Sequence, residues 1–284
     1  MIGISEYSYE LGVRTSIDIF EDKRDDLANV GLCHVPIDNE RLLSDMILTC
    51  CSRLKSRPDA IYIAHSAPFI RNGGDDSLSN ALNAPVFYLS GMPCAIMHEV
   101  VKAAVSQVSR GKYRRVWVVG ADKAYSNRER CFFGTVMGDS TVALAIETDA
   151  GQHLILGSYV NTHVYAAYGE NSKEEAISTY RAQTTLLLRE AYQRCLRSAG
   201  VKSVDYIAPH TPNHRVWDAF AEATGIDRSA IFDQGLVDTG HMNSHDSYFH
   251  YLRACEQGHI RKGDRVMLIN PGFGGTQGCT LIQK

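Results

Sequence analysis

Several absences narrow the kinds of protein that this chain can be. No apolar run approaches the roughly 18 residues that a membrane-spanning helix needs. The first residues have neither the basic region nor the apolar core of a signal peptide. The net charge of -3 offers no basic excess for binding nucleic acid. We therefore expect a cytoplasmic protein that binds neither membranes nor nucleic acid.

The cysteines and histidines also lack the spacing of a structural metal site. The chain has eight cysteines but no Cys-x-x-Cys pair. Without an export signal, reduced thiols are expected rather than a disulfide framework. His241, His245 and His250 are close in sequence, but a turn expected at Gly240 places His241 outside any helix. We interpret these histidines as polar lining of a site or as surface residues, and we expect no bound metal.

What the chain does contain is alternating apolar strands and amphipathic helices, the pattern of an α/β fold. Strands are predicted at residues 1–4, 16–20, 61–64, 86–89, 116–120, 141–147, 153–156, 206–208, 266–269 and 279–282. Helices are predicted at residues 41–54, 94–110, 184–198, 213–224 and 248–256. Loops are predicted at residues 21–26, 69–83, 123–137 and 157–172.

The two halves of the chain resemble each other. Residues 59–68 resemble residues 204–212, and residues 112–120 resemble residues 262–270. Each pair of segments brackets a loop, a helix and a strand in the same order. We predict two α/β halves, residues 1–150 and residues 151–284, related by a pseudo-twofold axis. The alternative is a chance similarity between buried strands.

Cys94 follows a predicted strand and a turn and stands at or near the start of a helix. The unpaired N–H groups and the positive end of a helix dipole favour the thiolate form there. Cys94 is therefore either a nucleophile or a small core residue. A pseudo-twofold axis would bring equivalent strand ends together, so His210 and His241 should lie beside Cys94. A thiol with two imidazoles suits covalent catalysis.

Four segments together resemble the β-ketoacyl-acyl carrier protein synthase III class of the thiolase superfamily. They are residues 87–95, 134–140, 209–215 and 240–275. The resemblance implies a five-layered αβαβα fold of two pseudo-repeated halves and acyl transfer through a cysteine thioester. It also implies a homodimer, with a heterodimer with another synthase subunit as an alternative.

The resemblance also assigns catalytic roles by position. Cys94 would accept the acyl group. His210 would bind the thioester carbonyl of the second substrate and stabilise the developing enolate or oxyanion. The backbone N–H groups of Cys94, Gly274 and Gly275 would form the oxyanion hole.

Further positions would bind the substrate. Arg215 would meet the phosphate of phosphopantetheine or of a carrier protein. Asn213 and Asn243 would line the substrate site. Phe132 and Phe133 would line the acyl pocket or the dimer interface, with plain core as an equal alternative. No cofactor is implied, because acyl-CoA or a phosphopantetheine-bound acyl group is the substrate.

The chain departs from the family pattern at His241, where the type-III enzymes have asparagine. Asn243 could be a displaced substitute. A Cys-His-His arrangement is that of the elongating ketosynthases, and an imidazole could also act as a general base for transfer to an alcohol or an amine. The chain is also short, which predicts a more open site or one completed by another chain, and the glycine turn at residues 273–278 is trimmed.

Two other side chains have competing interpretations. His98, one turn after Cys94, is expected to be a hydrogen-bonded core residue rather than a contact of the thiol. Asp246 could orient His241 or His245, or cap a helix that starts near Ser247, and capping is the favoured interpretation.

The sequence therefore predicts an acyltransferase or condensing enzyme. It would move an acyl group from acyl-CoA or acyl carrier protein, through a Cys94 thioester, to a carbon, oxygen or nitrogen acceptor. The expected setting is fatty-acid, polyketide or secondary metabolism. The alternatives are a non-catalytic partner subunit of a ketosynthase complex and a thioester hydrolase.

Overall fold

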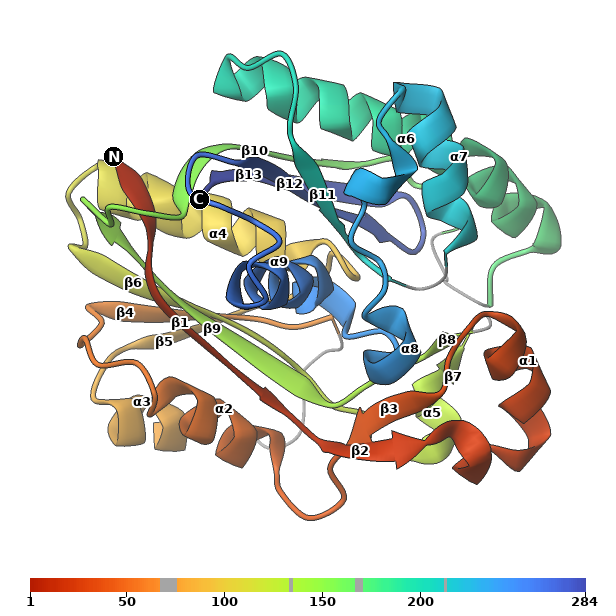
Figure 1. The fold of residues 1–284 in the computed structure, drawn as a ribbon. Helices are drawn as coiled ribbons and strands as arrows, with labels where there is room; N and C mark the ends of the chain where they lie inside the picture. The colour runs from red at the N-terminus through yellow and green to blue at the C-terminus, as the bar shows by residue number, and fades with distance from the viewer. Residues whose placement is uncertain (67–75, 133–134, 167–170, 212–213) are drawn as a thin grey trace.

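The fold consists of alternating layers of helices and sheet (Figure 1). The computed structural model describes residues 1–66, 76–132, 135–166, 171–211 and 214–284. The outer helices on one side are α2 (Leu43–Cys51) and α3 (Asp76–Leu82). Those on the other side are α6 (Glu174–Ala199) and α7 (Arg215–Thr224). Between the two sheet layers lie α4 (Ile96–Ser109) and α9 (Asp246–Glu256).

The strands of the two halves follow the same order. In the first half, β1 (Ile2–Leu11) neighbours β9 (Ser140–Thr148), followed by β6 (Arg115–Asp122), β4 (Ala60–Ala64) and β5 (Val86–Leu89). In the second half, β10 (Leu154–Thr162) neighbours β13 (Thr276–Gln283), followed by β12 (Arg265–Gly272) and β11 (Tyr206–Pro209).

The strand directions repeat as well. In each half the first two neighbouring pairs are antiparallel and the next pair is parallel. Ile231 forms an isolated parallel bridge with Ile207 of β11 and so takes the place that β5 takes beside β4. The predicted fold class, with its five layers and two pseudo-repeated halves, is therefore confirmed. The division at residues 150 and 151 falls in the turn between β9 and β10 and stays a prediction.

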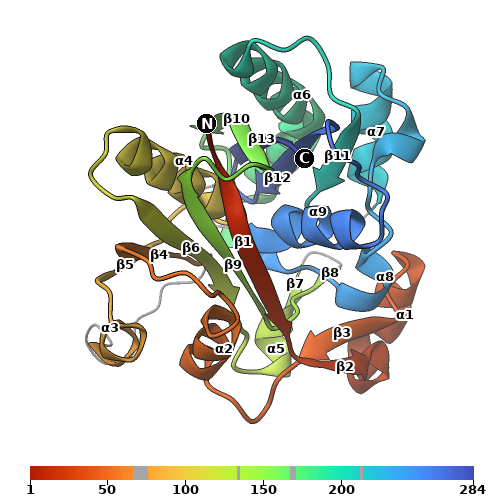
Figure 2. The ribbon, with the colours of Figure 1, turned by 60° about the vertical axis from the view of Figure 1, so that its left-hand side comes forward.

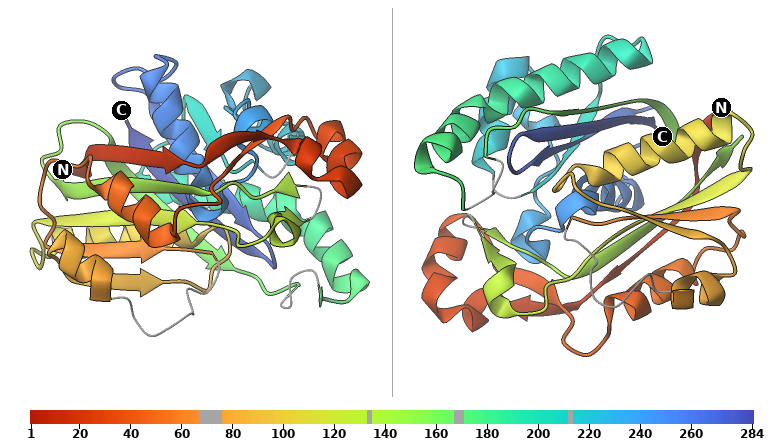
Figure 3. Two further views of the ribbon diagram at one scale, coloured as in Figure 1. Left: turned by 90° about the horizontal axis from the view of Figure 1, so that it is seen from below. Right: turned by 180° about the vertical axis from the view of Figure 1, so that it is seen from behind.

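The two halves are joined through a shared core. Residues on α4 and α9 pack in one hydrophobic cluster with strands of both halves, and Figure 2 and the rear view in Figure 3 show both helices between the sheet layers. The position of strand β4 explains why its residues are continuously apolar. Ile61 and Ile63 face α2, whereas Ala60 and Tyr62 face the central helices, so both faces of the strand are covered.

A small subdomain near the N-terminus was partly mispredicted. Residues 16–20, expected as a strand, contain the 3-10 helix η1 (Ile17–Ile19), because the Ser16 side chain caps its start. Residues 21–26, expected as a loop, contain η2 (Glu21–Lys23) and the start of α1 (Arg24–Asn29). They pack beside β2 (Val13–Ser16), β3 (His34–Ile37) and α8 (Leu236–Thr239).

Other predicted loops contain regular structure. Residues 123–137 hold α5 (Asn127–Arg130), β7 (Cys131–Phe132) and β8 (Thr135–Val136). Residues 157–162 continue β10, which pairs with β13 beyond a register shift at Gly157. Helix α6 begins at Glu174, well before residue 184. Helix α3 occupies the end of the loop predicted at residues 69–83, of which residues 69–75 lie outside the described residues.

Short 3-10 turns complete the second half. They are η4 (Arg228–Ala230) and η5 (Asn243–His245), which directly precedes α9. None of the helices in the described part of the chain combines the length and the apolar character needed to span a membrane.

Candidate active site

Cys94 stands on a tight turn between β5 and α4. The backbone at Cys94 has a φ of 58°, which a residue with a side chain rarely adopts. The helix begins two residues later, at Ile96, whose N–H donates to the Met92 carbonyl at 2.9 Å. Asn270 Nδ2 donates to the Cys94 carbonyl at 2.7 Å. The turn therefore holds the largely buried thiol in a fixed direction.

The turn needs a glycine on the neighbouring strand β12. A Cβ atom at Gly272 would lie only 2.0 Å from the Pro93 carbonyl oxygen. Any side chain at this position would push the turn away. The close approach of Gly272 to Pro93 thus fixes where the nucleophile turn sits relative to the second half of the chain.

The structure brings Cys94, His210 and His241 together. Cys94 Sγ lies 3.7 Å from His241 Nε2. The rings of His210 and His241 meet edge to face, with centroids 4.3 Å apart. The sulfur and one nitrogen of each ring all lie within 4.8 Å of one another. This is the meeting of strand ends across the pseudo-twofold axis that the sequence predicts, and their catalytic roles remain predictions.

Asp246 orients His241, contrary to the favoured expectation of a helix cap. Helix α9 begins at Asp246 itself, and one carboxylate oxygen lies 3.4 Å from His241 Nδ1. The Thr211 backbone N–H donates to the same oxygen at 2.8 Å. The other oxygen lies 3.0 Å from His250 Nε2. The carboxylate is therefore held between two imidazoles.

These contacts set the charge on His241. Burial alone would disfavour the imidazolium, but the hydrogen bonds with Asp246 and Cys94 outweigh burial and raise the pKa of His241 to about 10. Burial likewise opposes the charge on Asp246, yet the hydrogen bonds with His241 and His250 hold the pKa of Asp246 well below its usual value. At neutral pH, a protonated imidazole supported by a carboxylate faces the sulfur.

His210 has the opposite character. Burial, and then the neighbouring His241, hold the pKa of His210 well below its usual value, so its ring is neutral. Both ring nitrogens are buried and have no hydrogen-bond partner among the described residues. The Trp217 indole N–H donates to the His210 carbonyl at 2.8 Å and fixes the backbone after β11. A neutral imidazole with two unpaired nitrogens is suited to bind a polar group of a ligand.

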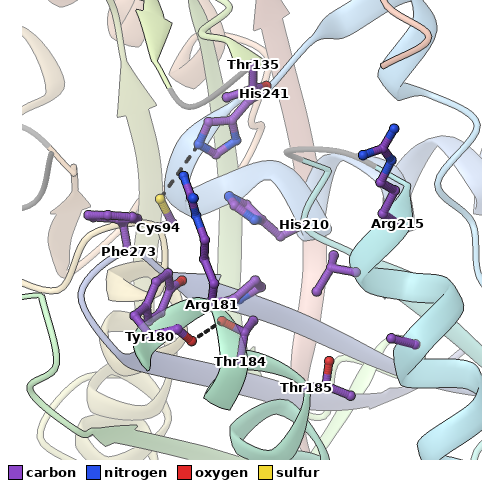
Figure 4. A pocket seen from close by; sticks show the side chains of 13 residues that line it. Cys94, Thr135, Tyr180, Arg181, Thr184, Thr185, His210, Arg215, His241 and Phe273 are labelled. Carbon is purple, nitrogen blue, oxygen red and sulfur yellow. Dashed lines mark hydrogen bonds between the residues drawn. The ribbon is translucent and has the colours of Figure 1, made fainter. Parts of the chain in front are cut away.

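These side chains border a cavity of about 530 Å³ (Figure 4). Its lining residues come from both halves of the chain. They are Cys94, Thr135, Tyr180, Arg181, Thr184, Thr185, His210, Arg215, Val216, Ala219, His241, Pro271 and Phe273.

The contribution of α6 to this cavity was missed in the sequence. Tyr180 and Arg181 lie in the part of the helix that precedes residue 184. The acidic pair Glu174 and Glu175 in the first turn was the available signal for the true start of this helix.

The predicted substrate-binding residues differ in where the structure places them. Arg215 is exposed at the start of α7 and lines the cavity. Asn243 Nδ2 contacts Met137 Sδ at 2.5 Å, so its amide does not replace His241 beside the thiol. Asn213 and Phe133 lie outside the described residues, as does the side chain of Phe132.

The predicted oxyanion donors are partly engaged. The Cys94 N–H donates to Ser66 Oγ at 3.3 Å, a long contact. The Gly275 N–H donates to the Gly272 carbonyl at 3.2 Å within its own turn. Gly274 and Gly275 have φ values of 92° and 114°, so the turn depends on glycine. The oxyanion hole stays a prediction.

The remaining histidines have other partners. His98 bonds Thr280 and Asn270 at 2.9 and 3.0 Å, which confirms it as a hydrogen-bonded core residue. His245 bonds Ser140 at 2.7 Å, and His250 contacts Asp246, so neither joins His241 in a shared ligand set.

The spacing within the Cys94, His210 and His241 cluster could also suit a metal ion. The expectation of no bound metal, which came from the sequence, therefore stays a prediction.

The layered fold of two pseudo-repeated halves is a thiolase-like fold. A synthase III structure from Aquifex aeolicus VF5 superposes with a TM-score of 0.84 at 20% identity, covering 100% of both chains. ChlB3, described as an acyltransferase, gives a TM-score of 0.86 at 17% identity over 99% of this chain and 97% of that one. Both likenesses concern the fold.

The sequence narrows the class further. Residues 196–284 match the family model of the 3-oxoacyl-[acyl-carrier-protein] synthase III C-terminal region. β-Ketoacyl-[acyl-carrier-protein] synthase III from Listeria innocua serovar 6a is 26% identical over 204 residues, which cover 67% of this chain and 64% of that enzyme. The match thus spans less than two thirds of the Listeria enzyme. The chain is thus similar to β-ketoacyl-[acyl-carrier-protein] synthase III enzymes, most specifically over residues 196–284.

Proposed function

We propose that this protein is an acyltransferase of the condensing-enzyme type. It moves an acyl group from acyl-CoA or acyl carrier protein through a Cys94 thioester to a carbon, oxygen or nitrogen acceptor in fatty-acid, polyketide or secondary metabolism. The observation that carries the proposal is the contact of Cys94 with His241 and of His241 with Asp246, beside the unpaired imidazole of His210.

In the first half-reaction the Cys94 thiolate attacks the thioester carbonyl. A new C–S bond forms to Cys94, and the bond to the leaving sulfur breaks. His241 gives its Nε2 proton to the leaving thiolate, and Asp246 stabilises the imidazolium until that transfer. The raised pKa of His241 supplies a proton donor 3.7 Å from the reacting sulfur.

In the second half-reaction an acceptor takes the acyl group. For an alcohol or amine, the neutral His241 removes the acceptor's proton as its oxygen or nitrogen attacks, and the bond to Cys94 breaks to return the thiolate. For a carbon acceptor, a malonyl thioester loses CO2 and leaves an enolate, to whose oxygen His210 donates a hydrogen bond. The enolate carbon then attacks the acyl carbonyl, a C–C bond forms, and the bond to Cys94 breaks to return the thiolate. The support of His241 by Asp246 favours the route that uses a base, and both routes remain within the proposal.

The setting and the partners are also part of the proposal. All eight cysteines are free thiols, as expected for the cytoplasm. Arg215 lies exposed at the cavity mouth, where it meets the phosphate of the arriving arm. We propose a homodimer, with a heterodimer with another synthase subunit as the alternative arrangement.

The test is intact-mass spectrometry after incubation with a panel of acyl-CoAs. One acyl group should attach to the wild type and to Cys33→Ala, which removes an exposed cysteine, but not to Cys94→Ala. His210→Ala should still acylate and should lose transfer to the acceptor.

Other outcomes separate the alternatives. Rapid release of free acid without an acceptor would favour a hydrolase. The absence of acylation by every CoA and carrier-bound donor would contradict the enzyme and leave the non-catalytic partner subunit.

A further inference from the structure

The cavity contains a positive charge that the proposed acyl transfer does not use. Arg181 lines the cavity together with Cys94. In Figure 4 its side chain extends from α6 toward the Cys94 and His241 pair. Within the described residues Arg181 has no hydrogen-bond or ion-pair partner. The lining residues given above include no aspartate or glutamate, so nothing that borders the cavity neutralises this guanidinium.

The helix turn that carries Arg181 lies close to the nucleophile. Burial, and the charge of the nearby Cys94, raise the pKa of Tyr180, the residue before Arg181. Tyr180 also packs edge to face on Phe273, another lining residue, with ring centroids 5.1 Å apart. Arg181 is an exposed residue, and its cation borders the space next to the thiol.

A second unpaired polar group faces the same space. The Thr135 hydroxyl is buried, has no hydrogen-bond partner among the described residues, and lines the cavity. A cavity built only for an alkyl chain would leave this hydroxyl unpaired, at a cost in free energy. A ligand with a polar, negatively charged end satisfies both groups.

We infer that Arg181 binds a carboxylate at the far end of the acyl group, so the donor is the thioester of a dicarboxylic acid. A guanidinium offers two parallel N–H donors that match the two oxygens of a carboxylate. The Thr135 hydroxyl supplies a further hydrogen bond. This inference rests on the proposed acyl transfer through Cys94.

The phosphate of the phosphopantetheine arm does not fit the position of Arg181. About thirteen bonds separate the thioester sulfur from that phosphate, roughly 15 Å when extended. A carboxylate two or three bonds beyond the thioester carbonyl stays near the thiol, toward which the Arg181 side chain extends in Figure 4, whereas the phosphate lies much farther from the sulfur.

The carboxylate could also belong to the acceptor, and the two sources are separated by measuring the first half-reaction alone. The experiment follows acylation of Cys94 without acceptor by intact mass. Succinyl-CoA, butyryl-CoA and β-alanyl-CoA give acyl groups of similar length with a negative, neutral and positive end. Adducts on Cys94→Ala measure non-enzymatic acylation and are subtracted.

We expect the wild type to use succinyl-CoA in preference to butyryl-CoA. Arg181→Ala should reduce this ratio of kcat/KM values about 10- to 100-fold, and Arg181→Lys should retain part of it because the charge remains. Arg189→Ala, on the exposed side of the same helix, should leave the ratio unchanged. Arg181→Glu should gain acylation by β-alanyl-CoA, which a misfolded variant could not do.

An unchanged ratio in Arg181→Ala, with butyryl-CoA still acylating Cys94, would overturn the inference and leave the proposed function standing. A ratio that changes only when a carboxylate-bearing acceptor is added would place the carboxylate on the acceptor and also overturn it. Failure of every donor to acylate Cys94 would overturn both.

Discussion

At the scale of single residues, the site depends on a row of contacts from Cys94 to Asp246. The thiol, His241 and Asp246 carboxylate follow one another at 3.7 and 3.4 Å. The sequence identified Cys94 because it follows a strand, and His241 because the turn at Gly240 precedes a helix as the turn before Cys94 does. The sequence offered Asp246 as a partner of His241 but favoured a helix cap, because the start of α9 could not be placed to a single residue. That start decides whether an aspartate caps a helix or faces inward.

Asp246→Asn should lower the pKa of His241 by at least about one unit, equal to about 1.4 kcal/mol. The amide removes the charge and the acceptor that hold the imidazolium. In the wild type the imidazolium contributes stability that is complete below about pH 6.5 and is lost as the pH rises through about 10. In the variant this contribution should be smaller and should be fully lost at a lower pH.

An NMR titration of the His241 ring measures the pKa, and acylation rates across the same pH range should fall about 10- to 100-fold in the variant. Asp238→Asn, an exposed partner of Arg14, is the control and should change neither. An unaltered His241 titration in Asp246→Asn would show that the carboxylate does not support the imidazole.

At the scale of elements, the sequence predicted buried strands better than the ends of helices. Strand β4 is apolar on both faces, and Ile61 and Tyr62 could be assigned without knowing their neighbours. The early turns of α6 were missed because the helix has a weak apolar stripe there, and Arg181 was missed with them. The contact between Gly272 and Pro93 joins segments far apart in sequence, so no local pattern reveals it.

Gly272→Ala should disturb the nucleophile turn. The added Cβ would meet the Pro93 carbonyl oxygen at 2.0 Å, a backbone atom that cannot move alone. We expect a loss of about 1–3 kcal/mol in the free energy of unfolding and a fall in the acylation rate of Cys94. Denaturant unfolding and intact mass measure the two effects.

Gly111→Asn is the matched control, because Gly111 also has a positive φ but has nothing within 4 Å. Asparagine tolerates this conformation. Equal effects of the two substitutions would mean that the close approach to Pro93 has no special importance.

At the scale of the whole molecule, the pseudo-repeat explains why the site exists where it does. In each half the corresponding strands end at the same edge of the sheet. Cys94 from one half therefore meets His210 and His241 from the other across the axis. The sequence contained this information in two short matching segments. The cavity shape depended on α6 and on the packing between halves, which single-sequence patterns do not encode.

The shared central core predicts that the halves unfold together. The chain has two tryptophans. Trp117 packs in the outer cluster of the first half and Trp217 in that of the second. Helices α4 and α9 join strands of both halves in one cluster. In each single-tryptophan variant, Trp117→Phe and Trp217→Phe, the fluorescence should therefore show one unfolding transition. That transition should coincide with the one measured by circular dichroism on the same variant. Distinct transitions in either variant would indicate halves that fold independently.

Peptide mapping of the protein, after reaction with the acyl-CoA that acylates it fastest, tests directly whether Cys94 carries the acyl group. We expect one acyl group on the peptide that contains Cys94, removed by hydroxylamine as a thioester and released when an acceptor is added. Acylation of another residue with Cys94 unmodified, or an adduct of equal amount in Cys94→Ala, would contradict this expectation.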